Sequence, residues 1–181
     1  QDYDINLSEL VVPSKALDFD GVDDYVATAS NISELNITGD ITIQTWMYIS
    51  SLPGDWVRLV GKGNSTYRTY GLWLNTSGQV MFQQYGGGGS NDVYIFANTT
   101  LSTGAWYHIA ATKSGNTITM YVNGVADGTE SYTGTPYSST EPLTIGSAVT
   151  FHGFLSGKLD EVEVWNVART QTQIQANMNK E

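Results

Sequence analysis

Hydrophobic and polar residues alternate with a period of two along most of the chain after residue 15. In the run ITIQTWMYIS (41–50), aliphatic side chains and one methionine share one face, and polar or aromatic side chains share the other. The first face holds Ile41, Ile43, Met47 and Ile49, and the second holds Gln44, Trp46 and Tyr48. Similar segments, rich in β-branched and aromatic residues, are separated by clusters of Gly, Asn, Asp and Ser. This spacing predicts an antiparallel β-sandwich or β-barrel in which one side of each strand faces a core.

A β-hairpin is expected between residues 105 and 124, where AWYHIAATKSGN is followed directly by TITMYVNG. The second segment places Ile118, Met120 and Val122 on one side and Thr117, Thr119 and Tyr121 on the other. Asn123 and Gly124 tolerate positive φ, so they predict a tight turn after this strand. The two segments are therefore predicted to be adjacent strands joined by residues 114–116.

The last alternating run, GKLDEVEVW (157–165), gives way to a different pattern at the C-terminal end. The run places Val162 and Val164 on one side and Glu161, Glu163 and Trp165 on the other. Beyond it the period of two is lost, and residues 168–179 are predicted to form a short helix with Thr170 as its cap. Residues 1–15 are predicted to be a leader that packs on the edge of one domain, residues 16–181.

Length and composition limit the classes of partner. A chain of 181 residues is large enough to bury a core without disulfides or metal. The net charge is −10, with only 8 Lys and Arg, so nucleic acid is not an expected partner. No apolar run is long enough for a transmembrane helix, so no membrane insertion is expected. The chain has no cysteine and few charged residues, a composition typical of extracellular or cell-surface β-proteins.

Eight motifs in order carry a resemblance to a known family. They are ALDFDGVDDYV, ITIQTWMYI, LVGKG, YGLWLNTSGQV, WYHIAATKSGN, YVNG, LTIG and GKLDEVEVWNVARTQTQI. Together they resemble the bacterial laminin-G-like, concanavalin A-like jelly-roll domains, from Ala16 to about Met178. The resemblance implies an all-β, two-sheet antiparallel jelly-roll sandwich within a larger multidomain secreted protein. It also implies glycan binding or adhesion and, in many members, a structural calcium ion.

The acidic segment FDGVDDYV (19–26) is a candidate calcium site. It supplies Asp20, Asp23 and Asp24, and Ca²⁺ prefers six to eight hard oxygen ligands. By the resemblance, Asp160 at the start of the last strand is expected to meet the N-terminal strand and share the cation. The alternative is that these aspartates only form turns with their own backbone.

Aromatic and amide side chains are candidates for a glycan site, because sugars present apolar C–H faces flanked by hydroxyl groups. The residues selected are Trp56, Trp73, Tyr85 and Asn91, which depart from simple core alternation, together with Gln83, Arg68 and Tyr70. Trp46, Trp106 and Trp165 are instead assigned to packing within and between strands. Because the chain is acidic, we expect a neutral polysaccharide to be tolerated better than an anionic one.

Catalysis is the weaker hypothesis. Glu161 and Glu163 are spaced on one strand like a glycosidase acid and base, but the E-x-D-x-(x)-E strand of jelly-roll glucanases does not occur. A solvated outer face is therefore the preferred interpretation of these two glutamates. No G-x-S-x-G motif is present, and neither His108 nor His152 has a nucleophile beside it in the sequence. The sequence thus predicts no catalytic residue and a carbohydrate-binding module. A protein-interaction or adhesion spacer is the second interpretation, and a glycoside hydrolase or lyase is the third.

Overall fold

The computed structural model describes residues 15–85, 92–134, 136–148 and 152–178. The predicted leader, apart from Lys15, and the candidate ligand residue Asn91 lie outside these ranges.

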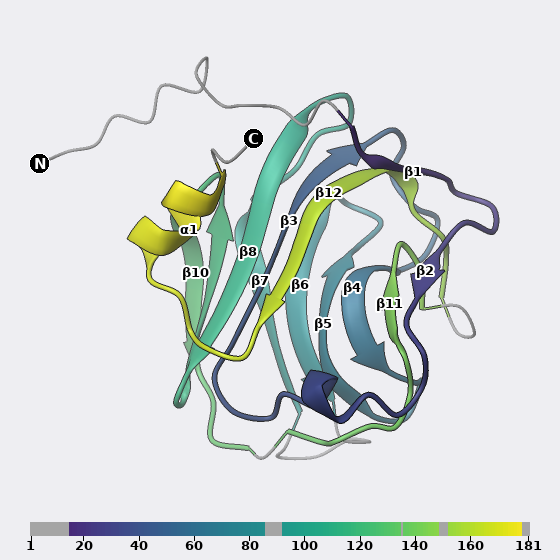
Figure 1. Ribbon diagram of the computed structural model, residues 1–181. Coiled ribbons are helices and arrows are strands. Elements are labelled where there is room, and N and C mark those ends of the chain that lie inside the picture. The colour runs from purple at the N-terminus through teal and green to yellow at the C-terminus, as the bar shows by residue number, and fades with distance from the viewer. Residues whose placement is uncertain (1–14, 86–91, 135, 149–151, 179–181) are drawn as a thin grey trace, which may run out of the picture.

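Two six-stranded antiparallel sheets face each other, which confirms the predicted sandwich (Figure 1). The first sheet contains, in spatial order, β1 (Leu17–Asp20), β12 (Ser156–Trp165), β3 (Ile41–Ile49), β8 (Trp106–Ser114), β9 (Thr117–Val122) and β10 (Val125–Ser131). The second contains β2 (Val26–Ala27), β11 (Leu143–Ile145), β4 (Val57–Gly63), β5 (Arg68–Leu74), β6 (Gln79–Tyr85) and β7 (Val93–Thr100). A short 3-10 helix, Ser33–Leu35, lies on the connection from β2 to β3.

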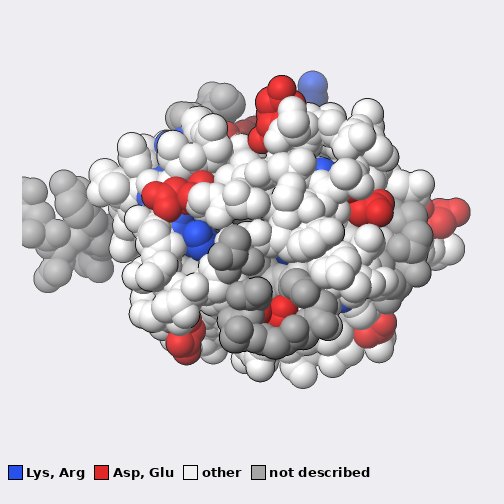
Figure 2. All heavy atoms as spheres, turned by 90° about the horizontal axis from the view of Figure 1, so that it is seen from below, with Lys and Arg blue, Asp and Glu red and all other residues white. Residues whose placement is uncertain are grey.

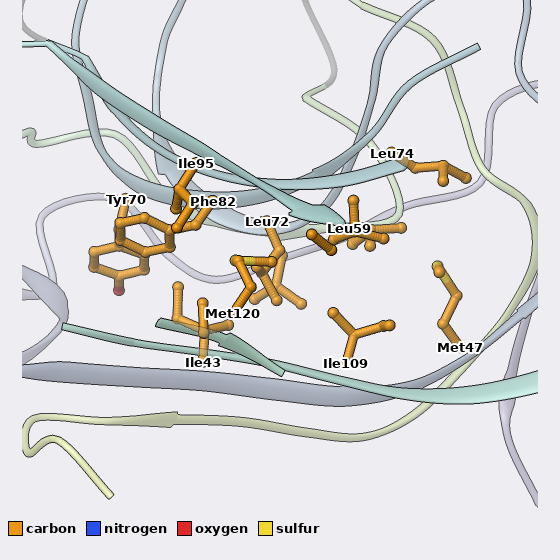
Figure 3. Packing of buried hydrophobic residues seen from close by; sticks show 14 of the residues in the cluster. Ile43, Met47, Leu59, Tyr70, Leu72, Leu74, Phe82, Ile95, Ile109 and Met120 are labelled. Atoms are coloured by element: carbon orange, nitrogen blue, oxygen red, sulfur yellow. The ribbon is translucent and has the colours of Figure 1, made fainter. Parts of the chain in front are cut away.

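The core lies between the two sheets and is formed by every second residue of their strands (Figure 3). From the first sheet it receives Ile43, Met47, Ile109 and Met120, and from the second Leu59, Tyr70, Leu72, Leu74, Phe82 and Ile95. All of these side chains are buried. Each fully buried aliphatic or aromatic side chain contributes about 1.5–3 kcal/mol, so this layer drives the association of the sheets.

The predicted hairpin is present. Strands β8 and β9 pair from Ile109 with Val122 to Ser114 with Thr117. Asn123 and Gly124 both have positive φ, at 50° and 72°, and connect β9 to β10. The turn residues therefore perform the role expected from their tolerance of left-handed backbone.

Helix α1 (Gln171–Met178) lies within the predicted range and covers part of the outer face of the first sheet (Figure 1). Thr170 caps it: the Gln173 backbone N–H donates to Thr170 Oγ1 at 3.3 Å, and the Thr170 N–H donates to Gln173 Oε1 at 2.9 Å. This reciprocal pair is a capping box. Ile174 is fully buried against Ala110 of β8 and Tyr121 of β9.

Strand β12 departs from regular alternation at one point. Its pairing with β3 shifts register between Asp160 and Glu163, and Glu161 has a φ of 47°. Such a bulge inserts one extra residue and changes the direction of the side chains around it. Val162 and Val164 still pack against the core, as predicted.

Candidate functional site

A pocket of about 410 Å³ opens on the outer face of the second sheet, over β5, β6 and β7. Its lining is formed by Trp56, Arg68, Trp73, Met81, Gln83, Tyr85, Tyr94, Phe96 and His152. Because Tyr70, Leu72 and Leu74 of β5 face the core, the intervening Trp73 faces outward. A register shift between Arg68 and Gly71 also places Arg68 beside this pocket.

Five of the seven predicted ligand residues line the pocket: Trp56, Arg68, Trp73, Gln83 and Tyr85. The other four lining residues, Met81, Tyr94, Phe96 and His152, were not among the predicted ligand residues. The first three could have been found from the period of two, because they share outward-facing positions with Gln83 or with one another. His152 lies on the connection between β11 and β12, and no local sequence pattern indicates that it reaches the pocket.

Tyr70 was predicted wrongly. Its ring is fully buried between the sheets, and its hydroxyl donates a hydrogen bond to the Leu35 backbone oxygen at 2.9 Å. Burial raises the pKa of this phenol above its ordinary value. Tyr70 therefore anchors the 3-10 helix segment to the core and contributes nothing to the pocket surface.

The floor of the pocket is the indole of Trp73, of which only 1 % is exposed. Its ring lies over Gly71, where an added Cβ would come within 2.7 Å of Trp73 Nε1. Gly71 pairs with Gly61 of β4, and a Cβ on Gly61 would lie 2.8 Å from the Gly71 Cα and 3.2 Å from Arg58 Cδ. Two opposed glycines thus leave room for large side chains to lie flat on the sheet.

Two guanidinium groups stack on this indole. The central carbon of Arg58 lies 4.8 Å from the Trp73 ring centroid, and that of Arg68 lies 5.1 Å from it. Arg58 is buried and donates to Thr144 Oγ1 at 3.1 Å and to the Gly63 oxygen at 3.0 Å. Burial and the nearby charge of Arg68 lower the pKa of Arg58 to about 9. Cation–π contacts of this kind hold both the indole and the arginines in place.

Polar groups of the pocket are fixed by hydrogen bonds. Arg68 Nη1 donates to Gln83 Oε1 at 2.6 Å, and its guanidinium lies 5.0 Å from the Tyr85 ring centroid. His152 Nδ1 lies 3.1 Å from Asp55 Oδ2, and its ring meets Trp73 edge-on at 5.4 Å. The hydrogen bond with His152 lowers the pKa of the Asp55 carboxyl. The donors and acceptors around the indole are therefore oriented before any ligand arrives.

A continuous aromatic wall stands beside this polar side. Trp56 contacts Phe96 with ring centroids 6.1 Å apart, and Phe96 contacts Tyr94 at 6.4 Å. Tyr94 is 62 % exposed, so this wall extends outward to solvent. The pocket thus combines apolar ring surfaces with fixed hydrogen-bonding groups.

The aspartates of the predicted calcium site do not all meet. Asp20, Asp23 and Asp24 each offer a carboxylate oxygen within 4.8 Å of the others, and all three are exposed. Asp20 Oδ1 accepts from the Val22 N–H at 2.8 Å, and Asp24 Oδ2 accepts from the Asp20 N–H at 3.1 Å. This all-oxygen donor set suits Ca²⁺ chemically.

Asp160 is not part of this group, contrary to the prediction. Residue 20 pairs with Ser156 in the β1–β12 register, so Asp160 lies four residues further along β12. That offset corresponds to about 13 Å of strand. Asp160 Oδ1 instead accepts from the Glu161 N–H at 2.8 Å, at the β12 bulge.

The carboxylates considered for catalysis also differ from expectation. Glu161 is exposed, but Glu163 is half-buried rather than solvated. Glu163 Oε2 accepts from Gln44 Nε2 at 2.7 Å, Trp165 Nε1 at 2.9 Å and Asn177 Nδ2 at 2.5 Å. Burial acts to raise the pKa of Glu163, but these hydrogen bonds outweigh it and lower the pKa overall. Glu163 therefore joins β12 and β3 to α1, and the bulge separates it from Glu161.

Comparison with known proteins identifies the family. A laminin-G model of the concanavalin A-like lectin/glucanases superfamily matches residues 20–175. The chain belongs to this superfamily. Membership confirms the resemblance seen in the ordered motifs. A stretch of 89 residues is also 34 % identical to pappalysin-1 of Mus musculus, covering 46 % of this chain and 5 % of that protein.

Solved structures share the concanavalin A-like fold across most of the chain. The CBM40 of a Ruminococcus gnavus IT-sialidase, bound to α2,3-sialyllactose, has a TM-score of 0.69 at 12 % identity, with 90 % of this chain and 97 % of that chain covered. Domain 4 of a Geobacillus stearothermophilus extracellular arabinanase, in complex with arabinotriose, has 0.65 at 15 %, covering 86 % and 72 %. A Trypanosoma rangeli sialidase has 0.66 at 16 %, covering 91 % and 27 %. At these identities the likeness shows the fold alone.

The part of the chain that the structure describes contains no helix long and apolar enough to cross a membrane.

Proposed function

We propose that this chain is a non-catalytic, extracellular carbohydrate-binding module that holds a neutral glycan in the pocket on its second sheet. The observation that supports this most directly is the placement of an aromatic wall and a buried indole floor beside fixed polar groups. Sugar rings stack their C–H faces on aromatic surfaces while amides and guanidinium groups bond to their hydroxyls. Sialyllactose and arabinotriose bound to proteins of the same fold support a sugar as the ligand.

The charge of the molecule favours a neutral ligand. The net charge of −10 repels anionic polymers at long range. The face shown in Figure 2 is mostly uncharged, with acidic side chains in small separate groups. Arg68, the cation in the pocket, already donates to Gln83, an arrangement that presents an amide and a guanidinium side by side to sugar hydroxyls.

The test is affinity electrophoresis against soluble arabinan, xylan, mannan, β-glucan and, as an anionic comparison, polysialic acid. We expect retardation by at least one neutral polymer, and at least about tenfold weaker binding after Trp56→Ala, because a lost stacking contact costs roughly 1.4 kcal/mol or more. Trp106→Ala is the matched control: Trp106 is also half-buried and contacts one aromatic ring, Tyr48, but lies on the first sheet. No retardation by any polymer would instead favour the adhesion spacer.

We also propose that Asp20, Asp23 and Asp24 hold a calcium ion. Three carboxylates within 4.8 Å of one another repel unless a cation or protons neutralise them. Asp20 ends β1, and Asp23 and Asp24 lie on the connection from β1 to β2, which belong to different sheets. A bound ion there would hold this connection in place at the edge of the sandwich.

A further inference from the structure

A second hollow, of about 190 Å³, lies on the same outer face, over β2, β11 and β4. Its surface includes Tyr25, Arg58, Asn64, Glu141, Thr144 and Ala148. None of these residues belongs to the lining of the larger pocket, and the proposed function does not use them. We call the larger pocket the primary subsite and this hollow the β4 subsite.

The two hollows adjoin each other at their floors. Trp73 forms the floor of the primary subsite, and Arg58, stacked on it at 4.8 Å, lines the β4 subsite. Ala148 of the β4 subsite packs in the same buried cluster as Trp73 and Met81. One stacked pair of side chains thus separates two openings on a continuous surface.

The sheet topology gives the distance between them. The strands of the second sheet lie in the order β2, β11, β4, β5, β6, β7. The β4 subsite extends over the first three of them, and the primary subsite extends over the last three. Adjacent strands lie about 4.8 Å apart, so the centres of the two hollows are about 10 to 15 Å apart. A single sugar ring cannot fill both, but a short oligosaccharide running across the strands can.

The chemistry of the β4 subsite suits the same kind of ligand. Tyr25 is 47 % exposed and offers a ring at the rim. Asn64 Nδ2 donates to Glu141 Oε1 at 3.3 Å, so an amide and a carboxylate are held together beside it. Arg58, fixed by Thr144 and the Gly63 oxygen, forms the floor. An aromatic rim with oriented donors and acceptors repeats the arrangement of the primary subsite.

We infer that the β4 subsite binds further units of the same glycan, and that the ligand is an extended chain spanning β2 to β7 rather than a single terminal sugar. This inference rests on the proposed function. The stacked pair of Trp73 and Arg58 then lies beneath the linkage between the two bound portions. Affinity should therefore depend on chain length.

Calorimetry with arabino-, xylo-, manno- and cello-oligosaccharides, from monosaccharide to hexasaccharide, tests the inference. For the series that binds, we expect affinity to rise at least about tenfold once the chain is long enough to reach the β4 subsite. Tyr25→Ala is expected to remove this gain while leaving the affinity for the shortest binding oligosaccharide unchanged. Glu141→Gln, which keeps the shape of the side chain, is expected to reduce the gain several-fold.

Tyr48→Ala is the matched control, because Tyr48 contacts Trp106 on the first sheet, away from both hollows. An affinity that is independent of chain length, or long-chain binding unaffected by Tyr25→Ala and Glu141→Gln, would overturn the inference. If Trp56→Ala still weakens binding in that case, the proposed function is retained and only the inference about the β4 subsite is rejected. Absence of binding by every oligosaccharide and polymer overturns both.

Discussion

The position of Trp73 depends on two residues that have no side chain. Gly71 lies beneath the indole, and Gly61 faces Gly71 across the β4–β5 pair. Without them, the indole and Arg58 could not lie parallel to the sheet, and the pocket would lose its floor. A tryptophan that is 1 % exposed can thus still support a binding surface, because exposed side chains of the pocket pack against it.

His108 predicts an unusual pH dependence of stability. It is 2 % exposed, edge-on to Trp46 at 5.5 Å, and burial lowers its pKa to about 4 despite the nearby charge of Glu163. Because the unfolded chain binds a proton near pH 6.5 and the folded chain does not, stability is lost as the pH falls through 6.5 toward 4. Between pH 7 and pH 5 we expect a loss of about 2 kcal/mol in the free energy of unfolding.

Urea denaturation at a series of pH values measures this loss. His108→Gln is expected to flatten the profile between pH 7 and pH 5, because it removes the titrating imidazole. Glu163, whose pKa is lowered, contributes a separate loss below its unfolded pKa of about 4.5. A slope that is the same in the protein and in His108→Gln would rule out a buried neutral histidine as its source.

At single residues, the sequence was a good guide to which side chains are special and a poorer guide to their direction. Trp73 and Tyr70 were both selected, yet only three positions apart on β5 they face opposite sides of the sheet. Regular alternation would have separated these two residues, whereas the outward position of Arg68, two residues before the buried Tyr70, comes from the bulge between Arg68 and Gly71, which depends on pairing with β6 rather than on local sequence. Tertiary packing also decides the surroundings of Glu163: the strand pattern predicts a solvated side chain, but α1 covers it.

Among the elements, α1 shows how local signals and tertiary packing combine. Thr170 and Gln173 form a capping box that could be anticipated from the sequence, and the spacing of Ile174 and Met178 is that of one face of a helix. Its target on the first sheet could not be anticipated, because Ala110 and Tyr121 come from different strands. The pattern that marks a buried helix face does not say what it is buried against.

Thr170→Ala should reduce the free energy of unfolding by about 1 kcal/mol, since the cap satisfies a backbone N–H of the first turn. Equilibrium denaturation in urea measures the change. Thr172→Ala is the matched control: Thr172 is exposed within the same helix, and alanine favours a helix more than threonine does. Equal effects of the two substitutions would show that the cap hydrogen bonds contribute nothing measurable.

In the whole molecule, the first connection crosses from one sheet to the other. Strand β1 is an edge of the first sheet, β2 is an edge of the second, and the acidic residues lie between them. A cation bound there would hold in place the connection that joins the two layers. An ion that binds only the folded state stabilises it by about 2.7 kcal/mol at one hundred times its dissociation constant.

Thermal melting in CaCl₂ therefore should occur about 5 to 10 °C higher than in EDTA, for a chain of this size. Asp23→Asn is expected to remove most of this shift, whereas Glu130→Gln, an exposed carboxylate on β10, leaves it intact. MgCl₂ at equal concentration controls for ionic strength. A melting temperature that does not respond to CaCl₂ would contradict the calcium proposal.

The fold of the whole molecule was predictable because eight motifs occur in a fixed order, and each combines a strand pattern with its turn residues. The pocket was predictable only in part. Trp56, Gln83 and Tyr85 carry their own signal, but the edge contributed by His152 comes from a distant connection. Contacts that form only when the two sheets and their connections come together cannot be predicted from the pattern of any single strand.

Because α1 covers part of the first sheet while both hollows open on the second, the two proposed subsites lie on the same side of the sandwich. If the proposed function is correct, a single copy binds one polysaccharide chain and does not cross-link two of them. Agglutination would require two copies held back to back by something outside this fold. Tandem copies facing the same way would instead gain avidity along one strand, since each additional contact then becomes intramolecular.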